Sequence, residues 1–304
     1  MDVVRNRLSV WRTELSYLVG LLAFVGIVEL IVLVFNPRLG GFWLGLVSLL
    51  LALIPAAIWL AIFYSQDRSE PEPKQYVIGV AVLAGLLAST IGRPLTHGYF
   101  NVTEWLGRDV LWEILGSILI LGFVTSFLIY AAVRFSIFYS SEFDQRIDGV
   151  VYGSAAGLGY AAMINIITVV SNGGVDLGAG VISIVVTQMV HGALGALIGY
   201  FLGRDKFDPK RVWWMTVGIT LAAILYGLFS WLSGEISQTG IKLAQGTVGG
   251  YSAWPSLLLG TLFAAVILGL VFTLVRRDLR SDMGLPPATT TTTTTTTVTT
   301  TPTA

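Results

Sequence analysis

The sequence contains no cysteine and only two histidines, His97 and His191. Disulfides, thiol nucleophiles and cysteine-ligated metals are therefore excluded, and any metal site would have to depend on carboxylates. Charged residues make up 12% of the chain, against about 25% in an average soluble domain. The formal net charge is zero, so nothing in the composition favours nucleic acid as a partner.

Apolar residues are abundant instead. They form 54% of the chain, and the mean hydropathy is +0.77. The first apolar run is too long for a signal peptide and no A-x-A site follows it, so we read it as an uncleaved span. We expect an all-α, polytopic integral membrane protein in a lipid bilayer, with about eight transmembrane helices. The expected spans are 17–35, 42–64, 76–95, 110–138, 149–170, 177–202, 212–232 and 254–275.

The basic residues indicate the orientation. With the N-terminus inside, 14 of the 18 Lys and Arg residues fall on the inner side of the eight spans, which is a positive-inside pattern with both termini cytoplasmic. We divide the chain into a cytoplasmic segment 1–16, a helical membrane domain 17–275 and a cytoplasmic tail 276–304. The Thr-rich end of the tail cannot pack a core, so we expect it to be disordered.

Few polar side chains lie deep in the spans, and these are candidates for function. Glu29 is the only acidic residue well inside an apolar run. Asn165 lies in the fifth span, and Gln188 and His191 share a face of the sixth because they are three residues apart. Hydrogen bonding between helices is favoured for these three over ligand binding. His191 is the one metal-ligand candidate, but a catalytic zinc usually takes three protein ligands.

Small residues recur at four-residue spacing in the fifth span, at Gly149, Gly153 and Gly157. Such spacing lets another helix approach closely. The sixth span has its own set, so we expect these two spans to pack together. Asp144 and Asp148 precede the apolar part of the fifth span, where negative charge near a helix N-terminus is stabilising. We interpret them as capping or salt-bridging residues.

Four stretches together resemble the PrsW family of intramembrane proteases, a relative of the CAAX-processing type. FYSQDRSEPEPKQ (63–75) is similar to the family's D-R-x-E-P-E-P loop, and GFVTSFLIYAAVRF (122–135) occupies the place of its glutamate-pair helix. EFDQRIDGVVYGSAAGLGYAAMIN (142–165) and HGALGALIGYFLG (191–203) match two further segments. The resemblance covers roughly 40–205. Its framework positions are Asp148, Gly149, Tyr152, Gly153, Gly157 and Gly159.

The sequence departs from the family pattern at its glutamates. The family's E-E-x-x-K falls on Tyr130 to Arg134, or one residue earlier with Ile129 first, and neither register contains a glutamate. The family's F-x-x-x-E places Ile164 where the glutamate stands, although Asn165 follows as in the pattern. In this family the glutamates and a histidine are taken to bind metal and activate water. Only His191 remains of that set.

We therefore interpret the chain as a non-catalytic, pseudoprotease-like member that binds membrane segments or regulates other membrane proteins, with no cofactor. One alternative is an active metalloendopeptidase in which zinc is held by rearranged ligands such as Glu29 and His191. The candidate catalytic residues are Glu29, Asn165 and His191. Another alternative is a small-solute transporter, although we find no inverted repeat of the kind many transporters show. The resemblance implies a multi-pass protein of a prokaryotic cytoplasmic membrane.

Overall fold

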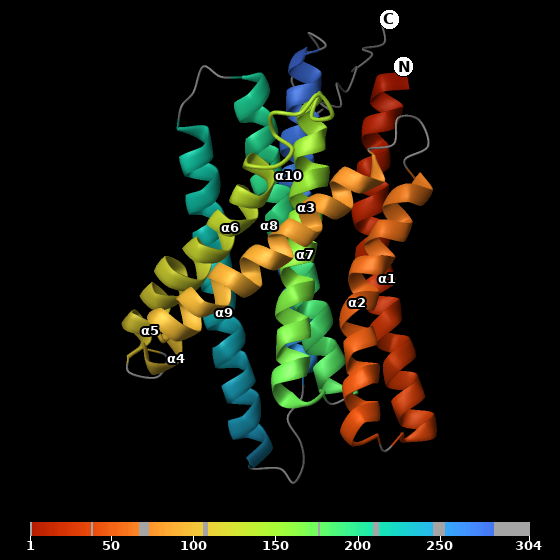
Figure 1. Cartoon of the computed structure of the whole chain (residues 1–304), viewed down its shortest axis with the longest axis vertical. Coiled ribbons are helices and arrows are strands. Elements are labelled where there is room, and N and C mark those ends of the chain that lie inside the picture. The colour runs from red at the N-terminus through yellow and green to blue at the C-terminus, as the bar shows by residue number, and fades with distance from the viewer. Residues whose placement is uncertain are drawn as a thin grey trace, which may run out of the picture.

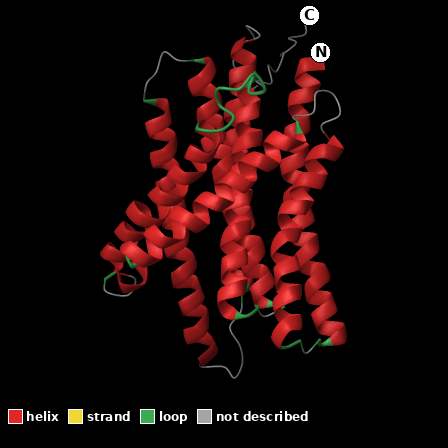
Figure 2. Cartoon of the chain, in the orientation of Figure 1, coloured by secondary structure: helices red, strands yellow, loops and turns green. Residues whose placement is uncertain are grey.

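The computed structural model describes residues 2–37, 39–66, 73–105, 109–175, 177–208, 213–245 and 253–282. These residues form helices joined by short turns and contain no strand (Figure 2). The elements are α1 (Asp2–Phe35), α2 (Gly41–Gln66), α3 (Lys74–Leu87), η1 (Ala88–Gly92), η2 (Pro94–Tyr99), α4 (Val102–Trp105), α5 (Val110–Gly116), η3 (Ser117–Gly122), α6 (Phe123–Arg134), α7 (Arg146–Asn172), α8 (Ala179–Phe207), α9 (Trp214–Gln245) and α10 (Trp254–Asp282).

Eight stretches of the described chain are long and apolar enough to cross a membrane. Two of them are composite: α3 continues through the π-helical segments η1 and η2, and α5 continues through the π-helix η3 into α6. The expected all-α membrane protein with eight spans is confirmed. The start of α1 and the end of α10 lie at the same end of the bundle (Figure 1). That this end is cytoplasmic stays a prediction from the charge distribution.

Two notable stretches fall outside the described residues. They are residues 67–72, which hold most of the D-R-x-E-P-E-P motif, and the Thr-rich end of the tail, within 283–304.

The fourth span ends earlier than expected. The fourth span was expected to reach residue 138, but α6 ends at Arg134, and the next residue leaves the helical conformation. The Arg134 guanidinium then lies 3.9 Å from the ring centre of Phe138 and pairs with Asp205 of α8 at 3.4 Å. The turn brings Phe138 back over Arg134. The seventh span was expected to end at 232, and the apolar part of α9 ends close by at Gly234, although the helix itself continues to Gln245.

The centre of the bundle is the antiparallel pair α7 and α8, which makes the most extensive helix contact in the molecule. In the apolar window of α8, 89% of the residues are buried. A Cβ atom added at Gly149, Gly153 or Gly157 would overlap carbonyl oxygens of Gly199, Gly195 or His191 in turn. The glycines therefore let the two backbones touch, as their spacing predicts.

The opposite side of α7 packs on α3 by the same means. A Cβ at Gly159 would overlap the carbonyl oxygen of Ala81. The helix is fixed at both ends as well. The Asp148 carboxylate accepts hydrogen bonds from the backbone N–H groups of Asp144 (2.9 Å) and Gln145 (2.6 Å), so Asp148 has the expected capping role. At the other end Gly173 adopts φ +68, a left-handed conformation that terminates the helix.

A polar clamp joins the helices at the end of the bundle where α10 ends. Arg204 of α8 pairs with Asp278 of α10 at 3.2 Å, and the Tyr200 hydroxyl donates to the same carboxylate at 2.9 Å. Arg146, at the start of α7, pairs with Asp208 at 3.0 Å. These contacts fix the positions of α7, α8 and α10 relative to one another at this end of the bundle.

Candidate functional site

His191 lies within α8 and is 3% exposed. Its imidazole is packed between two phenol rings from neighbouring helices. Tyr160 of α7 stacks on it with ring centres 5.5 Å apart and an interplanar angle of 18°. Tyr226 of α9 contacts it edge-on, with ring centres 5.0 Å apart. Three spans therefore determine the orientation of the ring.

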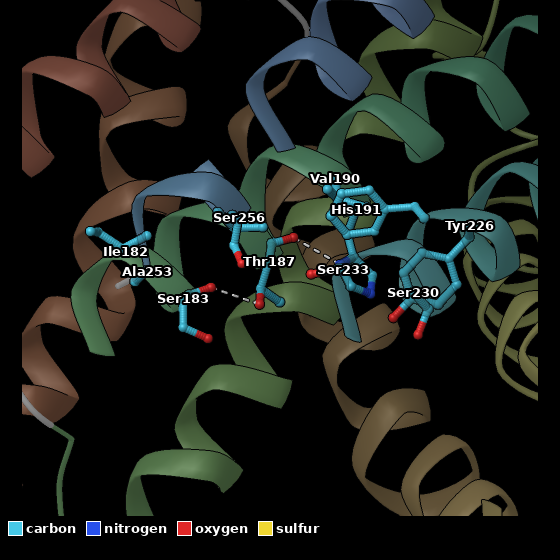
Figure 3. Close-up of a pocket in the computed structure, with 12 residues that line it drawn as sticks. Ile182, Ser183, Thr187, Val190, His191, Tyr226, Ser230, Ser233, Ala253 and Ser256 are labelled. Atoms are coloured by element: carbon cyan, nitrogen blue, oxygen red, sulfur yellow. Dashed lines mark hydrogen bonds between the residues drawn. The ribbon is translucent and has the colours of Figure 1, made fainter. Parts of the chain in front are cut away.

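The protonation pattern of His191 follows from its hydrogen bond. Nδ1 lies 2.8 Å from the backbone carbonyl oxygen of Thr187, one turn earlier in α8 (Figure 3). A carbonyl can only accept, so Nδ1 carries the proton and donates it. In the neutral imidazole the other ring nitrogen, Nε2, is then an acceptor with a free lone pair.

The ring borders a cavity of about 250 Å³ between α8, α9 and the start of α10. Besides His191, its polar lining consists of hydroxyl groups: Ser183, Thr187, Tyr226, Ser230, Ser233 and Ser256. The remaining lining residues are apolar. His191 lies twelve residues into α8, whereas Ser256 is close to the start of α10 and Ser233 close to the end of the α9 span. The cavity thus extends from the middle of α8 toward the end of the bundle where α8 and α10 begin.

A second layer of contacts positions Tyr160. Its hydroxyl lies 3.5 Å from the Thr125 hydroxyl of α6. It also occupies the space that a side chain at Gly92 would fill, because a Cβ there would come within 2.6 Å of the Tyr160 oxygen. Gly92 closes η1, and π-helical turns of this kind frequently accompany functional sites.

The other polar residues singled out in the sequence are not among the residues that line the cavity. Asn165 is buried and donates its side-chain amide to the carbonyl oxygen of Ile184 at 3.2 Å, so it links α7 to α8. Gln188 is fully buried, and its amide has no hydrogen-bond partner among the described residues. Glu29, on α1, does not line the cavity beside His191.

The positions that the resemblance pairs with the family's glutamates hold no carboxylate. Ile129 is fully buried in the hydrophobic core. Tyr130 and Ile164 are half-buried and pack against this core. In the described part of the chain, no three His, Asp or Glu side chains are grouped so that they could hold a metal ion. One imidazole among hydroxyl groups does not match the nitrogen, sulfur and carboxylate ligands of zinc. The residues present therefore do not fit the zinc site that the family resemblance implies.

Several residues of the site were not identified from the sequence. Tyr226 and Thr125 lie in other spans, and nothing local marks them as neighbours of His191. Ser230 and Ser233 carried a usable signal, because two hydroxyls three residues apart in an apolar span share one face of the helix. That signal indicates a polar face but does not indicate which helix it meets.

Comparisons with known proteins identify the same family as the resemblance. The model of the PrsW family intramembrane metalloprotease matches residues 72–259. Protease PrsW of Bacillus subtilis (strain 168) is 25% identical over 186 residues, which cover 60% of this chain and 81% of that protein. Protease PrsW of Geobacillus kaustophilus is 27% identical over 180 residues, covering 59% and 76%.

Protease PrsW of Halalkalibacterium halodurans is 28% identical over 179 residues, covering 59% of this chain and 79% of that protein. No solved structure matches the chain. The matched family region includes α7, α8, α9, His191 and all the residues named as lining the cavity. The chain therefore belongs to the PrsW family.

Proposed function

We propose that this protein is a non-catalytic member of the PrsW family that binds transmembrane segments of other membrane proteins and thereby regulates them. One observation carries the proposal. The residues at the positions of the family's glutamates are Ile129 or Tyr130 and Ile164, and the groups around His191 are phenols, hydroxyls and backbone.

Peptide hydrolysis in this setting requires an activated water molecule. A metal ion or a positioned general base can supply it. The cavity lacks the ligands that would hold zinc. His191 alone would be a weak base, because its Nδ1 partner is the neutral carbonyl of Thr187. In the catalytic triads of hydrolases a carboxylate at this place stabilises the imidazolium that forms.

Binding a transmembrane segment requires neither a metal ion nor a general base, and the packing of the helices around His191 is compatible with it. The glycine contacts between α7 and α8 hold in place the helix that carries His191 and one wall of the cavity. Hydroxyl groups that face a cavity inside a membrane can hydrogen-bond to polar groups of a guest helix. Ser230, Ser233 and Ser256 provide such groups from two helices.

The test is a reconstitution of the full chain into proteoliposomes with a panel of fluorescent single-span peptides. We expect saturable binding, measured by energy transfer, and no cleavage product on gels or by mass spectrometry. Ser230→Leu should weaken binding because it fills the cavity. Ser89→Leu is the matched control, since that hydroxyl bonds to Leu86 of its own helix on the exposed surface. Cleavage that disappears in His191→Ala would contradict the proposal and support a metalloprotease with rearranged ligands.

A further inference from the structure

Glu29 occupies an unusual place for a carboxylate. It lies six residues before Phe35, where the apolar span Ser16–Phe35 ends, or about 9 Å along the axis at 1.5 Å per residue. Its side chain is half-buried, so part of it reaches the outer surface of the bundle. Among the residues that the structure describes, none forms a hydrogen bond or an ion pair with it.

An isolated carboxylate at this depth is unfavourable in hydrocarbon, and intramembrane acidic residues generally pair with a cation or with polar groups. The described part of this chain does not provide such a partner for Glu29. A partner from outside the chain would supply it, and a cation on that partner complements the carboxylate most directly.

The surface next to Glu29 has the shape that a helix needs. Leu22, Gly26 and Leu33 share a face of α1 with Glu29, because they are three, four or seven residues away from it. Leu33 is 81% exposed. No atom lies within 4 Å of the position that a Cβ of Gly26 would take. A glycine one turn from a polar residue lets a second helix approach the backbone closely.

We infer that this α1 surface, formed by Leu22, Gly26, Glu29 and Leu33, binds a transmembrane helix of another protein that carries a lysine or arginine at the depth of Glu29. The inference rests on the proposed function and specifies the chemistry of the partner. The apolar residues contact the aliphatic part of the partner helix, and the carboxylate pairs with its cation. Since Glu29 does not line the His191 cavity, the two binding determinants can be separated by mutation.

A second copy of the chain is the main competing occupant. Arg93 is a basic residue inside an apolar span, Lys74–Tyr99, and its guanidinium already donates to the Ser171 hydroxyl at 3.4 Å. A helix of another protein is favoured because its cation need not be taken from an existing contact.

The experiment uses two synthetic single-span leucine–alanine peptides in proteoliposomes with the full chain. One peptide has a lysine two turns from the end of its apolar stretch, and the other has leucine there. We expect wild type to bind the lysine peptide at least about tenfold more tightly. Glu29→Gln should bring that ratio close to one. Glu113→Gln is the matched control, because Glu113 is another half-buried carboxylate near a helix end, and it should keep the ratio.

The outcomes separate the two proposals. Equal binding of both peptides to wild type, or a preference for lysine that survives in Glu29→Gln, overturns the role of Glu29 and leaves the proposed function standing. No binding of either peptide overturns both. Cleavage of the peptides overturns the proposed function, while the ratio of affinities still decides the role of Glu29. If Glu29→Gln dissociates a dimer detected by cross-linking and leaves the lysine preference unchanged, the occupant is a second copy and the inference is wrong.

Discussion

His191 is held as an aromatic residue would be, with Tyr160 on its face and Tyr226 at its edge. Among the described residues, its hydrogen bond is to the backbone carbonyl of Thr187 in its own helix. At the scale of the residue, His191 therefore stabilises the meeting point of α7, α8 and α9.

This role predicts a specific pattern of substitutions at position 191. Aromatic pairs contribute about 0.5–1.5 kcal/mol each beyond their buried area, so His191→Ala should lower the free energy of unfolding by about 1–3 kcal/mol. His191→Phe should recover most of the loss, because it restores both ring contacts. Thermal unfolding in detergent measures the effect. If His191→Phe were as damaging as His191→Ala, a polar or metal-binding role would be indicated.

Only some residues of the site are predictable from the sequence. Asp148 and Asn165 were identified because their roles depend on local position and on the polarity of a buried site. Tyr226 and Thr125 were not, because their importance arises from contacts across the bundle, and periodicity along one helix contains no information about its neighbours. That Ile129, Tyr130 and Ile164 stand where glutamates are expected follows only from the resemblance to the family pattern.

At the scale of the elements, the packing of the bundle depends on the glycine contact between α7 and α8. Its backbones meet without intervening side chains, so even one methyl group has no free space there. At Gly153 a Cβ would meet the Gly195 carbonyl oxygen and would lie 2.7 Å from Cα of Gly199. The neighbouring atoms belong to the backbone and cannot move aside as a flexible side chain would.

We therefore expect Gly153→Ala to destabilise the protein by about 1–3 kcal/mol, which is the usual cost of overpacking a core. Gly79→Ala is the control, because no atom lies within 4 Å of its Cβ position. It should change stability by less than about 1 kcal/mol, in the stabilising direction, because alanine favours the helix. Unfolding in detergent compares the two. Equal effects would show that α7 and α8 do not pack in the way described here.

The π-helical turns mark a limit of prediction at this scale. η1, η2 and η3 each replace ordinary α-helical turns inside an apolar span. A π-turn widens the helix locally without changing its hydropathy. The sequence therefore predicts the span but not the turn that brings Gly92 against Tyr160.

At the scale of the whole molecule, the number and order of the spans follow from the apolar runs of the sequence. All eight spans were predictable because the hydrocarbon core requires about 20 apolar residues per crossing and excludes unpaired backbone groups. The ends of the spans are less predictable. α6 ends at Arg134, whose side chain contacts Phe138 and Asp205, two residues outside α6.

The orientation in the membrane can be tested directly, because the chain has no cysteine. Ser141, between α6 and α7, and Asn172, at the end of α7, are exposed and lie at opposite ends of this helix. We expect Ser141→Cys to be protected from a membrane-impermeant maleimide in intact cells and Asn172→Cys to be labelled. The reverse result would overturn the cytoplasmic placement of the termini that the positive-inside rule predicts.

The most direct measurement for the whole molecule is the zinc content of the purified, detergent-solubilised chain, with wild type beside His191→Ala. Because no group of metal ligands surrounds His191 among the described residues, we expect far less than one zinc ion per chain in both proteins. Near-stoichiometric zinc in wild type that disappears in His191→Ala would contradict the non-catalytic assignment and would show that His191 shares a metal with other ligands.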